Sequence, residues 1–251
     1  MLVDADGALS GLFTDSDLAR LFEARRYEDF DRPMSELMTK RPTTVVVGTM
    51  LADAIAIYKL AEETKTPCWS SSQHRFSPGF SGMREHPEVG RVIGCDVYGG
   101  GKSDPETPGF IWSSLHSIET LYAIMGPGVV SVACTSTDKV EQFTCVWSDG
   151  RVGTYRGIKE GAVKYSATVF GEKGVSTAGI YGHGVPVQGV VPTKDKYMGY
   201  EGIAIEMAKF YKGGPTPVSA AETLEIFTLL KAAEESKAAG GKVVRLADIS
   251  K

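Results

Sequence analysis

The residues best suited to chemistry lie on one predicted helix, between positions 109 and 126. His116 and Glu119 are three residues apart, so a helix would bring an imidazole and a carboxylate within one turn of each other. Such a pair can hold a proton near neutral pH, which suits general acid–base catalysis. Trp112 follows the same spacing on a neighbouring face. The alternative for His116 is a core histidine that is hydrogen-bonded to Glu119 or to the backbone.

The helix that would position these groups is predicted to be buried. Apolar residues recur along it at steps of three and four, namely Ile111, Leu115, Ile118, Tyr122 and Met125. This stripe is typical of a helix that packs against other elements. The run Gly126-Pro127-Gly128 is predicted to end the helix.

Composition limits the class of protein. Of the 251 residues, 42% are hydrophobic and 23% charged, with a formal net charge of −4. These values predict a globular protein and argue against a nucleic-acid surface. No apolar run is long enough to span a bilayer and no signal peptide is evident, so we expect a cytoplasmic protein. The four cysteines form no C-x-x-C pair, which predicts free thiols and no metal site.

The chain around this helix alternates turn signals with short apolar runs. Strands are predicted at 89–98, 129–137, 142–147, 152–158, 162–170 and 175–181, with hairpin turns at 148–150 and 171–174. Helices are predicted at 49–63, 200–211 and 219–239, the last opened by a capping box of Ser219 and Glu222. This order predicts an α+β fold, with a large, mostly antiparallel open sheet and helices on one face.

A family resemblance begins near the helix at 51–63 and continues into Thr66-Pro67-Cys68-Trp69-Ser70-Ser71-Ser72-Gln73-His74-Arg75-Phe76-Ser77-Pro78. From about residue 49 to residue 251 the chain resembles the C-terminal domain of the Gfo/Idh/MocA family of sugar and inositol dehydrogenases. The resemblance implies a domain for substrate binding and oligomerisation, a sugar or polyol as ligand, and NAD or NADP as cofactor.

The family motif on this domain's helix is D-x-x-x-H-x-x-D. His116 matches the histidine and Glu119 the second acid, which implies a catalytic role for both. Trp112 stands where the first aspartate would be. This departure puts the usual carboxylate contact in doubt and predicts a different substrate shape, with the indole stacked on a sugar face.

Two further residues are candidates for substrate contact. Arg75, with His74 in a predicted polar strand, matches an arginine common in this family's first strand of the domain; the alternative is a surface or inter-strand ion pair. His183 lies in the glycine turn Gly182-His183-Gly184, where a plain loop residue is the alternative. Lys159 is predicted to be a solvated surface charge.

The cofactor half of the family's site has no counterpart in the sequence. A Rossmann site needs Gly-x-Gly-x-x-Gly between a strand and a helix, and no such pattern occurs. The family's Glu-Lys-Pro should precede the helix at 49–63, but residues 43–48 contain no lysine. We therefore expect that this chain alone does not bind NAD or NADP.

The first 48 residues resemble a different family. Gly11-Leu12-Phe13-Thr14-Asp15-Ser16-Asp17-Leu18 and the segment from Met34 to Pro42 resemble part of the cystathionine-β-synthase (CBS) module of arabinose-5-phosphate isomerase. The resemblance implies that Thr14 and Asp17 contact an adenine nucleotide. The alternative is that Thr14 and Asp15 cap the next helix. A complete nucleotide cleft needs two full repeats, so residues 1–48 are predicted to be a partial CBS-like segment.

Three functions follow from these patterns. The first is an oxidoreductase-derived chain that binds a sugar or polyol but does not transfer hydride alone. The second is a regulatory module that binds an adenine nucleotide. The third is an oligomerisation scaffold without a ligand. We also predict a homo-oligomer through the open sheet, on a face carrying Phe143, Cys145 and Trp147.

Overall fold

The structure, a computed structural model, describes residues 2–3, 9–12, 21, 24–40, 50–102, 109–179 and 200–249. The chain divides into two compact units, Met1–Val46 and Val47–Lys251. The division lies close to the junction predicted near residues 48 to 53, of which residues 48 and 49 are outside the described ranges.

Three short strands and two short helices have described bounds in the first unit. Its strands form an antiparallel sheet in the order β1-β2-β3. Arg32 joins the two short helices, because it forms ion pairs with Asp29 and with Glu36. The elements are β1 (Leu2–Val3), β2 (Leu9–Leu12), η1 (Tyr27–Asp31), α2 (Met34–Leu37) and β3 (Thr39–Lys40).

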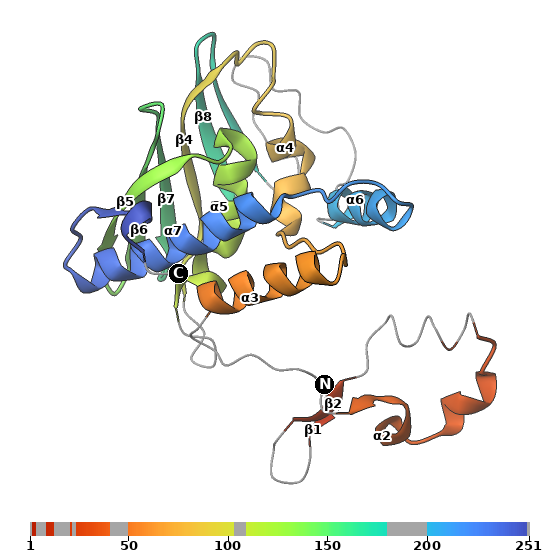
Figure 1. Cartoon of the computed structure of the whole chain (residues 1–251). Coiled ribbons are helices and arrows are strands. Elements are labelled where there is room, and N and C mark those ends of the chain that lie inside the picture. The colour runs from red at the N-terminus through yellow and green to blue at the C-terminus, as the bar shows by residue number, and fades with distance from the viewer. Residues whose placement is uncertain are drawn as a thin grey trace. The chain divides into compact units, whose positions relative to one another are not determined.

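The second unit is an α+β fold built on one large sheet (Figure 1). Its helical elements are α3 (Met50–Glu63), η2 (Gln73–Phe76), α4 (Pro78–Ser81), α5 (Phe110–Met125), α6 (Glu201–Tyr211), α7 (Ala220–Ala238) and η3 (Leu246–Asp248). Its strands are β4 (Val92–Gly100), β5 (Val129–Ser136), β6 (Val140–Trp147), β7 (Val152–Ile158), β8 (Ser166–Gly171), β9 (Val175–Gly179) and β10 (Val244–Arg245).

The sheet has the order β10-β5-β6-β7-β4-β8-β9. Only the β4–β7 pair is parallel among its described pairs. The α+β fold with a mostly antiparallel open sheet is therefore confirmed. Both predicted hairpins are present, since β6 pairs with β7 and β8 pairs with β9.

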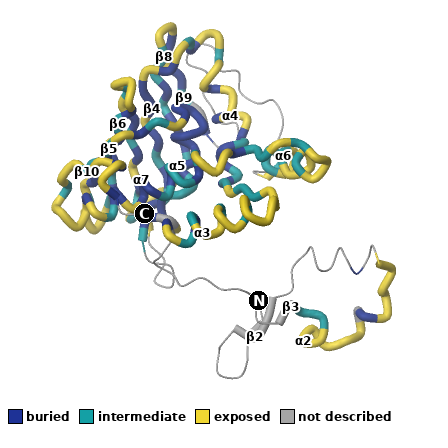
Figure 2. Tube along the Cα trace, in the orientation of Figure 1, coloured by how far each residue is buried: buried dark blue, intermediate teal, exposed yellow. Residues whose placement is uncertain are grey.

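The two faces of the sheet differ in burial, as Figure 2 shows along the strands. Phe143, Cys145 and Trp147 do share one face, but each is at most 2% exposed, because this face packs beneath α5 and α7. The prediction that they form an exposed oligomerisation patch was wrong. Alternation along a strand gives the residues of one face but does not say which face the helices cover.

Helix α5 crosses β4 and β7 and contacts α7, which also packs on β5 and α3. The predicted end of α5 is confirmed at Gly126, whose φ of 79° lies in the left-handed region that favours glycine. Arg84 and Arg151 donate hydrogen bonds to backbone carbonyls in the last turn of α5. Their positive charge also interacts favourably with the partial negative charge at this end of the helix.

One local prediction was wrong. His74 and Arg75 lie in the short 3-10 helix η2 rather than in a strand. The Ser72 hydroxyl accepts a hydrogen bond from the His74 backbone N–H and so caps this turn. Pro78 then starts α4 two residues after η2 ends. Serine and proline thus make this segment turn.

None of the described helices is long and apolar enough to cross a membrane.

The buried face should dominate the stability of the second unit. We expect Phe143→Ala to lower the free energy of unfolding by about 3–5 kcal/mol, because it leaves a cavity in a packed core. Thr144→Ala, one residue later on the exposed face, is the control and should change it by less than about 0.5 kcal/mol. Equilibrium urea unfolding measures both. Equal effects would contradict the assignment of the two faces.

Candidate functional site

His116 lies on α5 at the wall of a pocket of about 490 Å³. The pocket also touches the end of β4, the end of β7 and the segment before β8. Trp112, one turn before His116, is 59% exposed and lines the same pocket. An exposed indole beside an imidazole is a platform for an apolar ring face. The lining residues are Gly100, Lys102, Trp112, Ser113, His116, Ile158, Lys159, Gly161, Val163 and Tyr165.

The imidazole of His116 is positioned by His74 of η2 and by Ser72, which caps η2. Its Nδ1 lies 2.7 Å from the Ser72 hydroxyl oxygen. The His74 ring packs against the His116 ring at a centroid distance of 4.9 Å, and Tyr165 meets His74 edge-on at 4.6 Å. Among the described residues, none hydrogen-bonds the other nitrogen of His116, Nε2. That nitrogen is therefore the one left for a ligand.

Both histidines are neutral near pH 7. Burial lowers the pKa of His116 below its usual value. Burial, and then the neighbouring His116, lower the pKa of His74 to about 4. A low-dielectric surrounding disfavours a charged ring, and a second histidine nearby adds repulsion. His116 thus faces the pocket as an uncharged imidazole.

Glu119 turns away from His116 and toward a buried arginine. Arg75 Nε donates to Glu119 Oε2 at 2.6 Å, and Arg75 Nη1 donates to Glu222 Oε1 on α7 at 2.6 Å. Burial raises the pKa of Glu119, while Arg75 and a hydrogen bond from the Ser71 hydroxyl act in the opposite direction. The predicted His116–Glu119 contact is replaced by a Ser72–His116 contact and an Arg75–Glu119 ion pair.

Arg75 therefore forms ion pairs, as the alternative for it expected, but these pairs are buried and join helical elements instead of lying at the surface or between strands. Its side chain is only 10% exposed, and it does not line the pocket of His116. Burial alone would lower the pKa of Arg75, but Glu119 and Glu222 outweigh it and raise the pKa, so the guanidinium stays charged. Arg75 joins η2 to α5 and α7, and so fixes the elements that carry Ser72 and His116.

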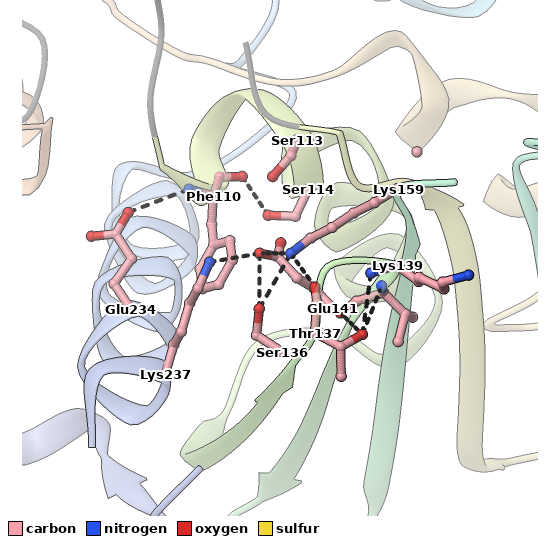
Figure 3. Close-up of polar contacts among 12 residues, drawn as sticks. Phe110, Ser113, Ser114, Ser136, Thr137, Lys139, Glu141, Lys159, Glu234 and Lys237 are labelled. Atoms are coloured by element: carbon pink, nitrogen blue, oxygen red, sulfur yellow. Dashed lines mark hydrogen bonds and ion pairs between the residues drawn. The ribbon is translucent and has the colours of Figure 1, made fainter. Parts of the chain in front are cut away.

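A second cluster surrounds the buried carboxylate of Glu141, and of its residues only Lys159 lines this pocket (Figure 3). Glu141 on β6 is fully buried, and its Oε1 lies 2.8 Å from Lys159 Nζ and 2.8 Å from Lys237 Nζ. Lys159 also donates to Ser136 Oγ at 3.2 Å and to the Thr137 carbonyl at 2.9 Å. The expectation of a solvated Lys159 was wrong, because all three of its N–H groups are engaged inside the protein.

Ser113 is a further residue of the pocket wall. It is 8% exposed and lines the pocket, and its hydroxyl oxygen is buried without a hydrogen-bond partner among the described residues. Ser113 thus lines the pocket without offering its enclosed hydroxyl oxygen to a ligand, and the sequence did not single this residue out.

Three predicted site residues cannot be placed. Thr14, Asp17 and His183 lie outside the described residues, so the predicted nucleotide and substrate contacts of these residues stay predictions. The same holds for the CBS-like assignment of residues 1–48.

Sequence reasoning missed the partners that position His116. The Ser70-Ser71-Ser72 run indicated only a polar segment, although Ser72 is followed by a turn that it caps. Tyr165 reaches His74 across β4, where Gly99 leaves the space, because a Cβ there would overlap the Tyr165 ring. Such contacts join residues far apart in the chain, and no local pattern marks them.

One place where a pyrophosphate could bind, the N-terminus of α5, is already occupied by a carboxylate. The end of β4 leads into the N-terminus of α5, but its first N–H, that of Phe110, already donates to Glu234 Oε1 at 3.3 Å. A carboxylate at this helix N-terminus occupies and repels the place where a pyrophosphate would bind. Within the described ranges, no three His, Cys, Asp or Glu side chains converge as metal ligands.

The environment of His74 makes a pH prediction. Since its pKa is about 4 in the folded chain, against 6.5 as the reference value, the unfolded chain takes up a proton that the folded chain does not. Stability should therefore fall as the pH drops from 6.5 to 4, by at most about 1.4 kcal/mol per pH unit for this group. The His74→Phe variant lacks this titrating group, so the unfolding free energy of the variant should depend less on pH than that of the wild type. Parallel curves for both proteins, from urea unfolding at each pH, would rule this out.

No family model matches the sequence, and no curated protein matches it. Solved structures of oxidoreductases resemble the fold. GenD2 from gentamicin A biosynthesis, in complex with NAD, has a TM-score of 0.63 at 16% identity, covering 78% of this chain and 68% of that chain. Levoglucosan dehydrogenase with NADH and L-sorbose has a TM-score of 0.60 at 15% identity, covering 79% and 71%. An oxidoreductase from Agrobacterium radiobacter, with NAD+, L-tartaric acid and magnesium, has a TM-score of 0.60 at 17% identity, covering 78% and 70%. The chain therefore shares the fold of a large part of these NAD-linked oxidoreductases, as the resemblance of residues 49–251 predicted.

Proposed function

We propose that this chain binds a sugar or polyol in the pocket of His116, as the substrate-binding part of a Gfo/Idh/MocA-like dehydrogenase. One observation carries the proposal: a neutral His116, fixed through Nδ1 by Ser72, lies beside the exposed indole of Trp112 in one pocket. The shared fold with dehydrogenases, one of which holds L-sorbose in its structure, supports the same ligand class.

The pocket suits the two kinds of surface that a sugar presents. The apolar face of a sugar ring would stack on Trp112. One of its hydroxyl oxygens would meet His116 Nε2, which has no partner in the described protein. In the proposed dehydrogenase role, His116 holds or moves the proton of the reacting oxygen. Glu119 would act only indirectly, because its carboxylate contacts Arg75 and Ser71 instead of the pocket.

Hydride transfer would need a nicotinamide, which accepts or supplies the hydride when it is bound. Since Glu234 occupies the N-terminus of α5, we propose that this chain alone binds the sugar and does not turn it over. Nucleotide binding would then depend on a part beyond the described residues.

Ligand binding is testable by calorimetry with a panel of myo-inositol, aldohexoses and ketohexoses, each alone and with NAD or NADP. At least one sugar or polyol should bind the full chain without dinucleotide. Trp112→Ala should weaken this binding about tenfold, because a lost stacking contact costs on the order of 1.4 kcal/mol. Tyr211→Ala removes an aromatic side chain that is 76% exposed on α6, away from the pocket lining, and should leave binding unchanged.

Two results would count against this function. The first is that no sugar or polyol binds. The second is that NAD or NADP alone binds tightly, which would mean that the chain carries a nucleotide site of its own.

We also propose that the chain forms a homo-oligomer through the outer face of the sheet. Strand pairing places four apolar side chains in one row across this face, Val146, Val152, Phe170 and Val175, with Gly94 between the second and third. Val152 and Val175 are 44% and 39% exposed. An apolar row on the outer face of the sheet is a surface that a second copy could cover.

Light scattering tests the oligomer. The wild-type chain should have the mass of two or more copies, and Val152→Lys should shift it toward one copy, because a lysine cannot be buried there without a partner. Ile57→Lys changes an equally exposed residue on α3 and should leave the mass unchanged. A monomeric wild type at micromolar concentration would refute the proposal.

A further inference from the structure

The Ser72 hydroxyl meets three polar groups, and their chemistry limits where its proton can go. It accepts a hydrogen bond from the His74 backbone N–H at 3.2 Å. It lies 2.7 Å from His116 Nδ1 and 3.4 Å from Gln73 Oε1. A backbone amide only donates, so this contact leaves the single hydroxyl proton of Ser72 free for one of the other two.

The distances favour His116 as the acceptor. A separation of 2.7 Å is typical of a bond donated by a hydroxyl, whereas a bond donated by a ring N–H is usually closer to 2.9 Å. The separation of 3.4 Å to Gln73 is outside the usual range for a hydroxyl donor. His116 is neutral, so only one of its two nitrogens carries hydrogen.

We propose that Ser72 is a positioning residue that fixes the tautomer of His116. Its hydroxyl donates to Nδ1, so the ring hydrogen of His116 stays on Nε2 and faces the pocket. The pocket therefore presents an N–H donor to a ligand oxygen rather than a lone pair. Ser72 is itself fixed, because it caps η2 and because Arg75 ties η2 to α5 and α7.

This tautomer narrows the class of ligand that the pocket would bind. That narrower ligand class rests on the proposed function, the binding of a sugar or polyol beside His116. An N–H donor binds an oxygen that accepts, such as the carbonyl of a ketose or of an oxidised inositol. A hydroxyl can take this place only if its own proton goes to another group. In the free chain, His116 is thus set to donate a proton to a carbonyl oxygen and cannot act as a base until that proton has left.

Nitrogen-15 NMR of the ring nitrogens reads the tautomer directly. The full chain is labelled on histidine, and the His116 signals are identified by their loss in His116→Gln. At neutral pH we expect Nδ1 to carry no hydrogen and to accept a hydrogen bond, and we expect Nε2 to carry the ring hydrogen. In Ser72→Ala the Nδ1 signal should shift away from its hydrogen-bonded position, and Ser72→Thr, which keeps the hydroxyl, should restore it.

Ser71→Ala is the matched control. Ser71 is the preceding residue, but its hydroxyl donates to Glu119 and not to His116, so the His116 signals should stay in place. A wild-type His116 protonated on Nδ1, or a spectrum that Ser72→Ala leaves unchanged, would overturn the proposal. Circular dichroism shows whether each variant is folded. The measurement needs no sugar, so its failure is separate from a failure of sugar binding.

Discussion

The buried guanidinium of Arg75 is the interaction on which the arrangement of the site depends. It lies between carboxylates of α5 and α7, at 2.6 Å from each. An arginine in a buried position is stable only with partners that match its geometry. The three elements must therefore meet in one way. Because Ser72 lies three residues before Arg75, this requirement also fixes the hydroxyl that holds His116.

The same buried charge explains why His116 and Glu119 do not act as a pair. A carboxylate that satisfies Arg75 is not free to orient an imidazole. The histidine is oriented by a hydroxyl and by ring packing instead, both of which suit a neutral ring. His116, which faces the pocket, is thus distinct from the charged side chains that hold the surrounding helices together. Glu141 with Lys159 and Lys237 repeats this division, because these charges pair with one another and only Lys159 lines the pocket (Figure 3).

Local patterns were enough to predict most of the fold of the second unit. Period-two alternation and glycine turns gave the strands and hairpins, and the end of α5 followed from Gly126. The Ser219 cap of α7 was also correct, since its hydroxyl accepts from the Glu222 N–H. The pattern failed at η2, where a serine cap overrides an extended prediction. It also could not tell which sheet face the helices cover, because both faces carry alternating residues of suitable size.

The sequence by itself determined the elements and the central role of the helix bearing His116, because these depend on residues close together in the chain. Only the tertiary structure decided what each side chain contacts. Glu119 and Glu222 are brought to Arg75, and Ser72 to His116, from distant parts of the chain. The burial of these charges limits them to partners that neutralise them, and packing determines which partners are within reach.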